Sequence, residues 1–254
     1  MKKIRIIPRL DVKGPNVVKG IHMEGLRVMG SPVTLAKKYF DQGADELIYM
    51  DIVASLYRRN IDFELVKAVA NELYIPLTVG GGIRNLQDIN DVLRVGADKV
   101  AINTYATKHP EFLKEAVRRF GSQCIVLTVE AKRSHKMPSG WEVYTDGGRE
   151  HSGRDVVEWV KEGLSCEIGE IMLTSVDFDG TRKGYDLELI EKISHLSPVP
   201  LVVYGGARDA RSMIDAVEKG VVDGLSCASI LHYDEWTIRN LKQELHDVPL
   251  PIRL

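Results

Sequence analysis

Two carboxylates, Asp11 and Glu130, stand at the ends of short apolar runs in the first and the second half of the chain. The run before Glu130, Ile125–Val129, is typical of a strand buried on both faces. Two carboxylates in a partly desolvated cleft can divide into one proton donor and one proton acceptor. The pair therefore indicates acid–base chemistry, although each residue could instead be a solvated strand end.

Glycine-rich turns follow two other expected strands, at Gly80–Gly82 and Gly205–Gly206. Glycine lets backbone N–H groups approach an anion closely, and barrel enzymes often bind phosphate in such loops. A small polar dipeptide follows the neighbouring strand in each half. We predict two phosphate sites on opposite rims and a long substrate with a phosphate at each end; the residues are Gly82, Asn103 and Thr104, and Gly206, Ala228 and Ser229. The alternative is that the glycines only make tight turns.

Two further features are expected near the same rim. Lys19 is suited to bind a phosphate or to raise the acidity of a neighbouring group. Asp179 opens the sequence Asp179-Gly180-Thr181 after the sixth strand, where it could cap a phosphate-binding turn of backbone N–H groups.

Charges of alternating sign lie at or near the N-terminal ends of four expected strands: Arg5, Glu46, Lys99 and Glu170. They could close a ring across the floor of a barrel. Composition alone favours the plainer interpretation that they are solvated strand ends.

Short apolar runs alternate along the chain with longer amphipathic stretches. Strands are expected at Ile4–Leu10, Glu46–Asp51, Leu77–Val79, Lys99–Asn103, Cys124–Glu130, Glu170–Thr174, Leu201–Tyr204 and Val222–Ser226. Helices are expected at Val33–Asp41, Asn85–Val95, Pro110–Phe120, Asp155–Glu162, Asp186–His195, Asp209–Lys219 and Asp234–Leu245. Eight β-then-α units predict an α/β protein, a single (β/α)8 TIM barrel over residues 1–254. A doubly wound open sheet is the alternative, and Trp141–Thr145 looks like a small hairpin that serves as a lid.

The chain also repeats itself at an offset of 124 positions, at which Pro76–Arg84 matches Pro200–Arg208. Asp11 and Glu130 each close the first expected strand of their half. We therefore predict an internal half-barrel repeat, with halves at about 1–120 and 121–254. The two carboxylates should then face each other across the C-terminal mouth of the barrel.

The composition limits the partners. A formal net charge of −2 over 254 residues gives no reason to expect nucleic acid or an anionic membrane, and no segment approaches the roughly 20 apolar residues of a membrane helix. Three distant cysteines form no disulfide framework, which favours a reducing cytoplasm. The histidines lack ligand spacing and there is no P-loop or dinucleotide fingerprint, so we expect neither a metal nor a cofactor.

Short stretches over nearly the whole chain form one joint pattern: Arg5–Pro8, Leu10–Lys13, Val17–Gly20, Asp45–Leu47, Thr78–Arg84, Gly96–Val100, Phe120–Gln123, Leu173–Ser175 and Asp179–Thr181. This highly specific pattern resembles the cyclase subunit of imidazole glycerol phosphate synthase. The resemblance implies a barrel that receives ammonia from a glutaminase subunit docked on its N-terminal face. Ammonia would attack a bis-phosphorylated ribulosyl-formimino carboxamide nucleotide to give imidazole glycerol phosphate and an aminoimidazole carboxamide ribotide.

The resemblance also assigns roles. The acid–base pair falls on Asp11 and Glu130. Substrate and phosphate contacts fall on Lys19, Gly82, Asn103, Thr104, Thr174, Asp179, Gly180, Gly206, Ala228 and Ser229. The charged ammonia gate falls on Arg5, Glu46, Lys99 and Glu170.

The acid–base centre departs from the family pattern. Glu130 replaces an aspartate that is one methylene shorter, and a misplacement of about 1 Å can lower a rate by about 10²-fold. Arg9 stands where the family usually has cysteine, and strand alternation points it to the side of Asp11, where a cation lowers the pKa of a carboxylate. Tyr204 replaces a small residue, and Phe178 replaces a typically polar one.

Three functions are therefore considered. The first is the cyclase of histidine biosynthesis. The second is a paralogous conduit that passes ammonia to a sugar amidotransferase in surface-glycan synthesis. The third is a phosphosugar isomerase on the same barrel, since a fold alone does not fix a function. The resemblance favours the first.

Overall fold

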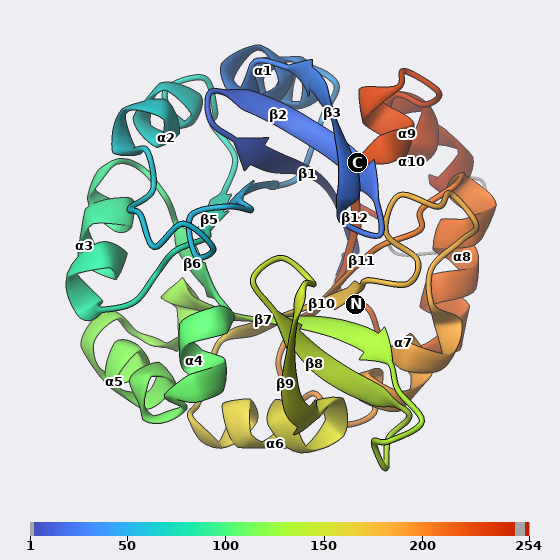
Figure 1. Cartoon of the computed structure of the whole chain (residues 1–254). Coiled ribbons are helices and arrows are strands. Elements are labelled where there is room, and N and C mark those ends of the chain that lie inside the picture. Colours follow the sequence, from blue (N-terminus) through green and yellow to red (C-terminus); the bar gives the residue numbers. More distant parts are fainter. Residues whose placement is uncertain (1–2, 247–251, 254) are drawn as a thin grey trace.

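Eight parallel strands close into a barrel within residues 3–246 and 252–253, the part of the chain that this computed structural model describes (Figure 1). Their order around the barrel is β1 (Arg5–Lys13), β4 (Leu47–Asp51), β5 (Leu77–Gly80), β6 (Lys99–Ile102), β7 (Ile125–Arg133), β10 (Glu170–Ser175), β11 (Leu201–Tyr204) and β12 (Gly224–Cys227). Strand β12 then pairs with β1 and closes the barrel. The predicted (β/α)8 TIM barrel is confirmed.

A ring of helices surrounds the strands: α1 (Pro32–Asp41), α2 (Phe63–Ala70), α3 (Leu86–Arg94), α4 (Thr104–Lys108), α5 (Glu111–Phe120), α6 (Val156–Ser165), α7 (Leu187–Ser194), α8 (Ala210–Lys219), α9 (Ser229–His232) and α10 (Ile238–His246), with a 3₁₀ turn at Ser122–Cys124. In several of these helices a polar N-cap side chain accepts a hydrogen bond from a backbone N–H of the first turn, as Asp155 does in α6 and Asp209 in α8. Helix α2 and the short helices α4 and α9 were not predicted, and α10 begins at Ile238 rather than at the expected Asp234.

The barrel strands are buried on both faces because alternate side chains point to the helices and to the barrel axis. In β7, Leu127 and Val129 join the core beneath the helices, whereas Val126 points inward. The inward residues form an apolar layer across the middle of the barrel: Ile7, Ile48, Met50, Ala101, Val126, Met172 and Val202.

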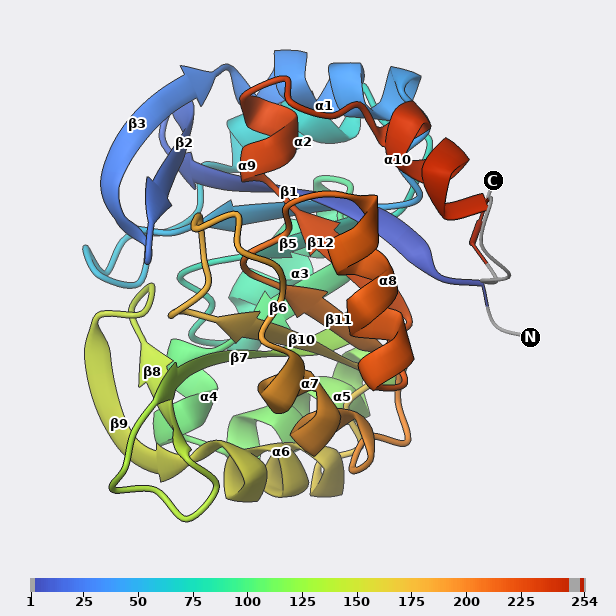
Figure 2. The ribbon, with the colours of Figure 1, turned by 90° about the vertical axis from the view of Figure 1, so that its right-hand side faces the viewer.

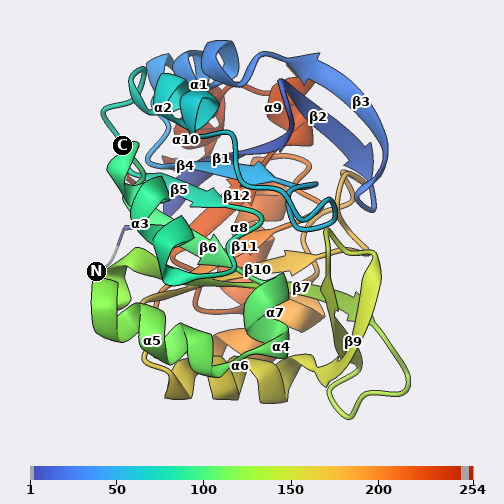
Figure 3. The ribbon, with the colours of Figure 1, turned by 60° about the vertical axis from the view of Figure 1, so that its left-hand side comes forward.

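Two antiparallel hairpins extend the barrel at one end: β2 (Asn16–Ile21) with β3 (Glu24–Gly30), and β8 (Trp141–Thr145) with β9 (Glu150–Asp155). Figures 2 and 3 show both hairpins at the end opposite the start of β1 and the end of α10. The residues Trp141–Thr145, expected to form a small hairpin, instead form a single strand, β8, whose hairpin partner is β9, and the β2–β3 hairpin was not predicted. Each half of the chain carries one hairpin after its first strand, which fits the proposed half-barrel repeat.

The first strand of each half is longer than predicted. Strands β1 and β7 were expected to end near Asp11 and Glu130, but both continue beyond these residues because they pair with β2 and β8. The two carboxylates thus lie within strands rather than at strand ends; Glu130 is paired on both sides, and Asp11 is paired with Met50 on β4. No described helix combines the length and the apolar character that crossing a membrane requires.

Candidate active site

A cavity of about 410 Å³ opens at the hairpin end of the barrel. Its lining comes from strands of both halves and from both hairpins, and it includes Asp11 and Glu130. Both carboxylates are almost fully buried, with 5% and 6% of their surface exposed. The structure therefore brings the two predicted acid–base residues to one desolvated mouth, while their catalytic roles stay predictions.

Asp11 is surrounded by donors from the chain itself. Its Oδ1 accepts a hydrogen bond from Arg9 Nε at 2.7 Å, and its Oδ2 accepts one from the Tyr204 hydroxyl at 3.2 Å. Lys19 Nζ lies 3.7 Å from Oδ2. Burial alone would raise the pKa of Asp11, but the charges of Arg9 and Lys19 outweigh burial and lower it. Asp11 is consequently held as a carboxylate.

Arg9 itself is locked in place. The side chain is 1% exposed, and its guanidinium stacks on the Tyr204 ring at 4.2 Å from the centroid. A second guanidinium nitrogen donates to the Thr174 hydroxyl at 3.3 Å. Thr174, a predicted substrate contact, is fully buried and lines neither the large cavity nor the smaller pocket described below. Its hydroxyl accepts the hydrogen bond from Arg9, and its role as a substrate contact stays a prediction.

Glu130 lies in a different electrostatic environment. Its Oε2 accepts a hydrogen bond from the Gly148 N–H at 2.8 Å, at the tip of the β8–β9 hairpin. Burial raises the pKa of Glu130 to about 7, and the opposing effects of Arg9 and of the Gly148 N–H are smaller. The longer side chain thus reaches the hairpin tip, and the group carries a proton up to near-neutral pH.

The raised pKa of Glu130 predicts how the free energy of unfolding changes with pH. The folded pKa of Glu130, about 7, lies above the ordinary value of 4.5, so its stabilising contribution is complete below pH 4.5 and is lost as the pH rises through 7. Glu130→Gln cannot ionise and should gain stability over the wild type by about 2–3 kcal/mol between pH 5 and pH 8. Urea unfolding at both values measures this gain. Exposed Glu158→Gln on α6 is the control, and a pH-independent difference for Glu130→Gln would contradict the buried neutral carboxyl.

The first predicted phosphate site lies on the wall of the large cavity, where Gly82, Asn103 and Thr104 all contribute to its lining. The turn needs glycine because Gly81 has φ +106° and a Cβ there would lie 2.1 Å from the Asp51 carbonyl oxygen. The Thr104 hydroxyl accepts the Asp146 N–H at 3.0 Å, which ties this rim to the β8–β9 hairpin.

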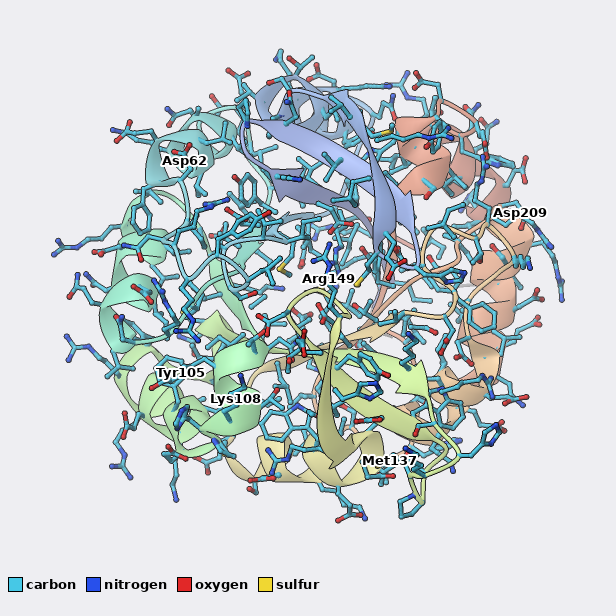
Figure 4. The ribbon with its side chains drawn as sticks, in the orientation of Figure 1. Asp62, Tyr105, Lys108, Met137, Arg149 and Asp209 are labelled. Carbon is cyan, nitrogen blue, oxygen red and sulfur yellow. The ribbon has the colours of Figure 1, made fainter. Side chains whose placement is uncertain are left out.

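Four cations that the sequence analysis did not select surround this site: Arg58, Arg84, Lys108 and Arg149. In the described part of the chain, none of the four has a carboxylate partner within ion-pair distance. Figure 4 shows Arg149 over the centre of the mouth, and Lys108 on α4 at its side. In the sequence, Asp146-Gly147-Gly148 is typical of a turn and indicates this hairpin tip. Unpaired cations beside a glycine turn favour a phosphate group.

The second predicted phosphate site is a smaller pocket of about 10 Å³, lined by Asp179, Gly180, Gly206, Ala228 and Ser229 among others. Lys19 Nζ donates to both carboxylate oxygens of Asp179, at 2.7 and 2.8 Å. This buried ion pair joins β2 to the loop after β10 and separates the pocket from the large cavity. Gly206 has φ +93°, and a Cβ there would lie 2.0 Å from the Gly184 carbonyl oxygen.

The four charges at the barrel floor form a closed ring. Arg5 bonds Glu46 and Glu170 at 2.7 Å each, and Lys99 bonds the same two carboxylates at 3.0 and 2.7 Å. The residues are thus paired across the barrel axis rather than solvated separately, and their role as a gate stays a prediction. In the residues that the structure describes, no group of three or more His, Cys, Asp or Glu could hold a metal ion.

Comparisons with known proteins place this geometry in a family. A model of the histidine biosynthesis protein family matches residues 5–237. The imidazole glycerol phosphate synthase subunit HisF of Streptococcus sanguinis is 44% identical, with both chains fully covered. The HisF subunit of Corynebacterium diphtheriae is 46% identical over 95% of each chain, and that of Legionella pneumophila is 56% identical over 81% of this chain and 96% of its own. The chain belongs to the HisF family, the cyclase subunits of imidazole glycerol phosphate synthase.

Proposed function

We propose that this chain uses ammonia from a glutaminase subunit to convert the bis-phosphorylated ribulosyl-formimino carboxamide nucleotide into imidazole glycerol phosphate and aminoimidazole carboxamide ribotide. The observation that carries the proposal is a pair of buried carboxyl groups, Asp11 and Glu130, in one cavity between two glycine-turn sites, with environments that shift their pKa values in opposite directions.

The reaction forms a carbon–nitrogen bond at the ribulosyl carbonyl, releases that oxygen as water and breaks the bond to the ribotide amine, and the pair can supply two of the proton transfers. Attack by ammonia on the substrate gives a nitrogen that must lose a proton, and Asp11 is the ionised acceptor. The departing amine of the ribotide must gain a proton, and Glu130 is the protonated donor. Arg9 makes Asp11 a weaker base than a free aspartate, because a carboxylate of lowered pKa accepts a proton less readily.

The two phosphates of the substrate would be held differently. At the Gly82 end, unpaired Arg84, Lys108 and Arg149 supply charge around the backbone N–H groups of the turn. At the Gly206 end, Lys19 is already paired with Asp179, so a phosphate would have to draw Lys19 away from that carboxylate. We therefore expect the Gly82 end to bind first.

A glutaminase subunit would dock on the N-terminal face of the barrel, where the ring of Arg5, Glu46, Lys99 and Glu170 spans the axis. The relatives named above are subunits of a synthase, which supports a partner chain. Their names also favour the cyclase over the conduit that serves a sugar amidotransferase.

The proposed activity is tested without the glutaminase. Wild-type protein supplied with ammonium and the bis-phosphorylated nucleotide should consume the nucleotide and release the aminoimidazole ribotide, which can be followed by its absorbance. Turnover should saturate in both reactants. A folded protein that binds the nucleotide but shows no turnover at saturating ammonium would refute the cyclase and favour the conduit.

If the ring at the barrel floor is a gate, disrupting it should affect cyclisation with ammonia from the glutaminase but not cyclisation with free ammonium. Lys99→Ala removes the contacts to Glu46 and Glu170 and opens the ring, so that ammonia and water exchange at the floor. With the glutaminase bound, product formed per glutamine hydrolysed should fall by about tenfold, equivalent to about 1.4 kcal/mol in the barrier. Turnover with free ammonium should stay near the wild type, as should both activities of Lys161→Ala on α6. Equal losses from both sources would exclude a gating role.

A further inference from the structure

The side chain of Arg9 occupies one side of the barrel interior. Its guanidinium is fixed by Asp11 at 2.7 Å, by Thr174 at 3.3 Å and by the Tyr204 ring at 4.2 Å, so it fills the side of the barrel formed by β1, β10 and β11. The lining of the large cavity extends along the strands on the other side of the barrel. There it reaches Met50 on β4, Ala101 on β6 and Thr128 on β7.

Thr128 is the polar residue at the bottom of this open side. It is 2% exposed, and its Oγ1 has no hydrogen-bond partner among the described residues. Buried hydroxyls are nearly always bonded, so an orphan on a cavity wall points to a small polar occupant. Thr128 precedes Glu130 by two residues on the same face of β7, which puts it about 7 Å deeper in the barrel.

The surroundings of Thr128 favour a neutral occupant. Met50 and Ala101 are apolar, and no carboxylate bonds the Thr128 hydroxyl among the described residues. An ammonium ion would be desolvated there, whereas uncharged ammonia can donate an N–H to the hydroxyl oxygen and keep its lone pair free.

A buried hydroxyl outside both pockets provides a control. Ser194 at the end of α7 is 4% exposed, and its Oγ donates to the Glu191 carbonyl oxygen at 3.4 Å. Ser194 lines neither the large cavity nor the small pocket. It therefore shares the burial of Thr128 but lies away from the proposed substrate contacts.

We propose that Thr128 is a positioning residue for ammonia. The Thr128 hydroxyl holds the nucleophile two residues before Glu130 on β7, on the side of the barrel that Arg9 leaves open. The inference rests on the proposed cyclase function and adds the route and the last binding point of its nucleophile. The hydroxyl orients the nitrogen lone pair, and no covalent step involves Thr128.

The test is the dependence of cyclisation on free ammonia at fixed pH. Thr128→Val keeps the shape and removes the hydroxyl, and it should raise KM for ammonia about two- to tenfold with kcat nearly unchanged, the effect of one lost neutral hydrogen bond. Thr128→Ser retains the hydroxyl and should stay near the wild-type KM. Ser194→Ala should leave KM unchanged. Thermal unfolding shows whether each variant is folded.

An unchanged KM in folded Thr128→Val would overturn the inference, as would equal rises in Thr128→Val and Ser194→Ala, which would mean a general disturbance of the fold. A wild-type protein without ammonium-dependent turnover would instead refute the proposed function, and the inference with it. A rise confined to Thr128→Val and rescued in Thr128→Ser supports the positioning role.

Discussion

Replacing Glu130 with glutamine should lower kcat/KM for ammonium-dependent cyclisation by about 10²–10⁴-fold, the range for loss of a general acid or base. The amide cannot donate a proton to the departing amine, although it nearly keeps the size of the carboxyl group. The measurement is nucleotide consumption under saturating ammonium. Glu130→Asp retains a carboxyl group and should keep or raise the activity, and Glu158→Gln on the outer helix α6 should leave it unchanged.

The pH dependence of the wild type should report the same group. Because Glu130 must be protonated to donate, kcat/KM should fall as the pH rises above about 7. The assay must hold the concentration of uncharged ammonia constant, since ammonium itself deprotonates with rising pH. No acidic limb is expected near neutrality, because the pKa of Asp11 is lowered. Activity that rises through pH 7 under these conditions would assign Glu130 as a base instead.

Removal of Arg9 should have the largest effect on stability. Arg9→Met keeps an unbranched apolar stem but leaves the Asp11 carboxylate buried without its closest cation. Breaking one partner of a buried pair typically lowers the free energy of unfolding by about 3–5 kcal/mol. Urea denaturation at pH 7 measures the loss. The loss should shrink in acid, because Asp11 without Arg9 regains a raised pKa and can become neutral.

A double substitution separates the pair from general packing. Arg9→Met with Asp11→Asn removes both charges and should recover most of the stability lost in Arg9→Met, whereas Asp11→Asn alone leaves the buried guanidinium uncompensated. Losses that simply add in the double variant would show that Arg9 acts through packing on Tyr204 and not through its charge.

The barrel could be predicted from the sequence because its strands are short apolar runs whose burial on both faces leaves a clear pattern. The outer strands of the hairpins, β3 and β9, could not, because they lack that pattern. Strand β9 reads Glu-His-Ser-Gly-Arg-Asp, and β3 is mostly exposed, so both are specified by pairing with a neighbour rather than by burial. For this reason the predicted strands ended at Asp11 and Glu130, while the real ones continue into hairpins.

The candidate site shows the same limit at the level of single contacts. Strand alternation correctly put Arg9 on the side of Asp11, and the expected lowering of a carboxylate pKa falls on Asp11. The partners that lock Arg9, Thr174 and Tyr204, are far away in the chain and come together only when the barrel closes. The bond from Gly148 to Glu130 likewise depends on where the hairpin folds back.

The floor ring contains two cations and two carboxylates, and the layer above it is apolar. An ion that crossed this layer would shed its water without meeting a counter-charge, at an effective penalty of several kcal/mol. On the proposed route from the floor to the mouth, nitrogen would therefore cross as the free base and leave its fourth proton below. The barrel would then act as a proton filter: the acidity of the medium at the floor would set how much nucleophile enters, while the protons used in the chemistry would come from the mouth.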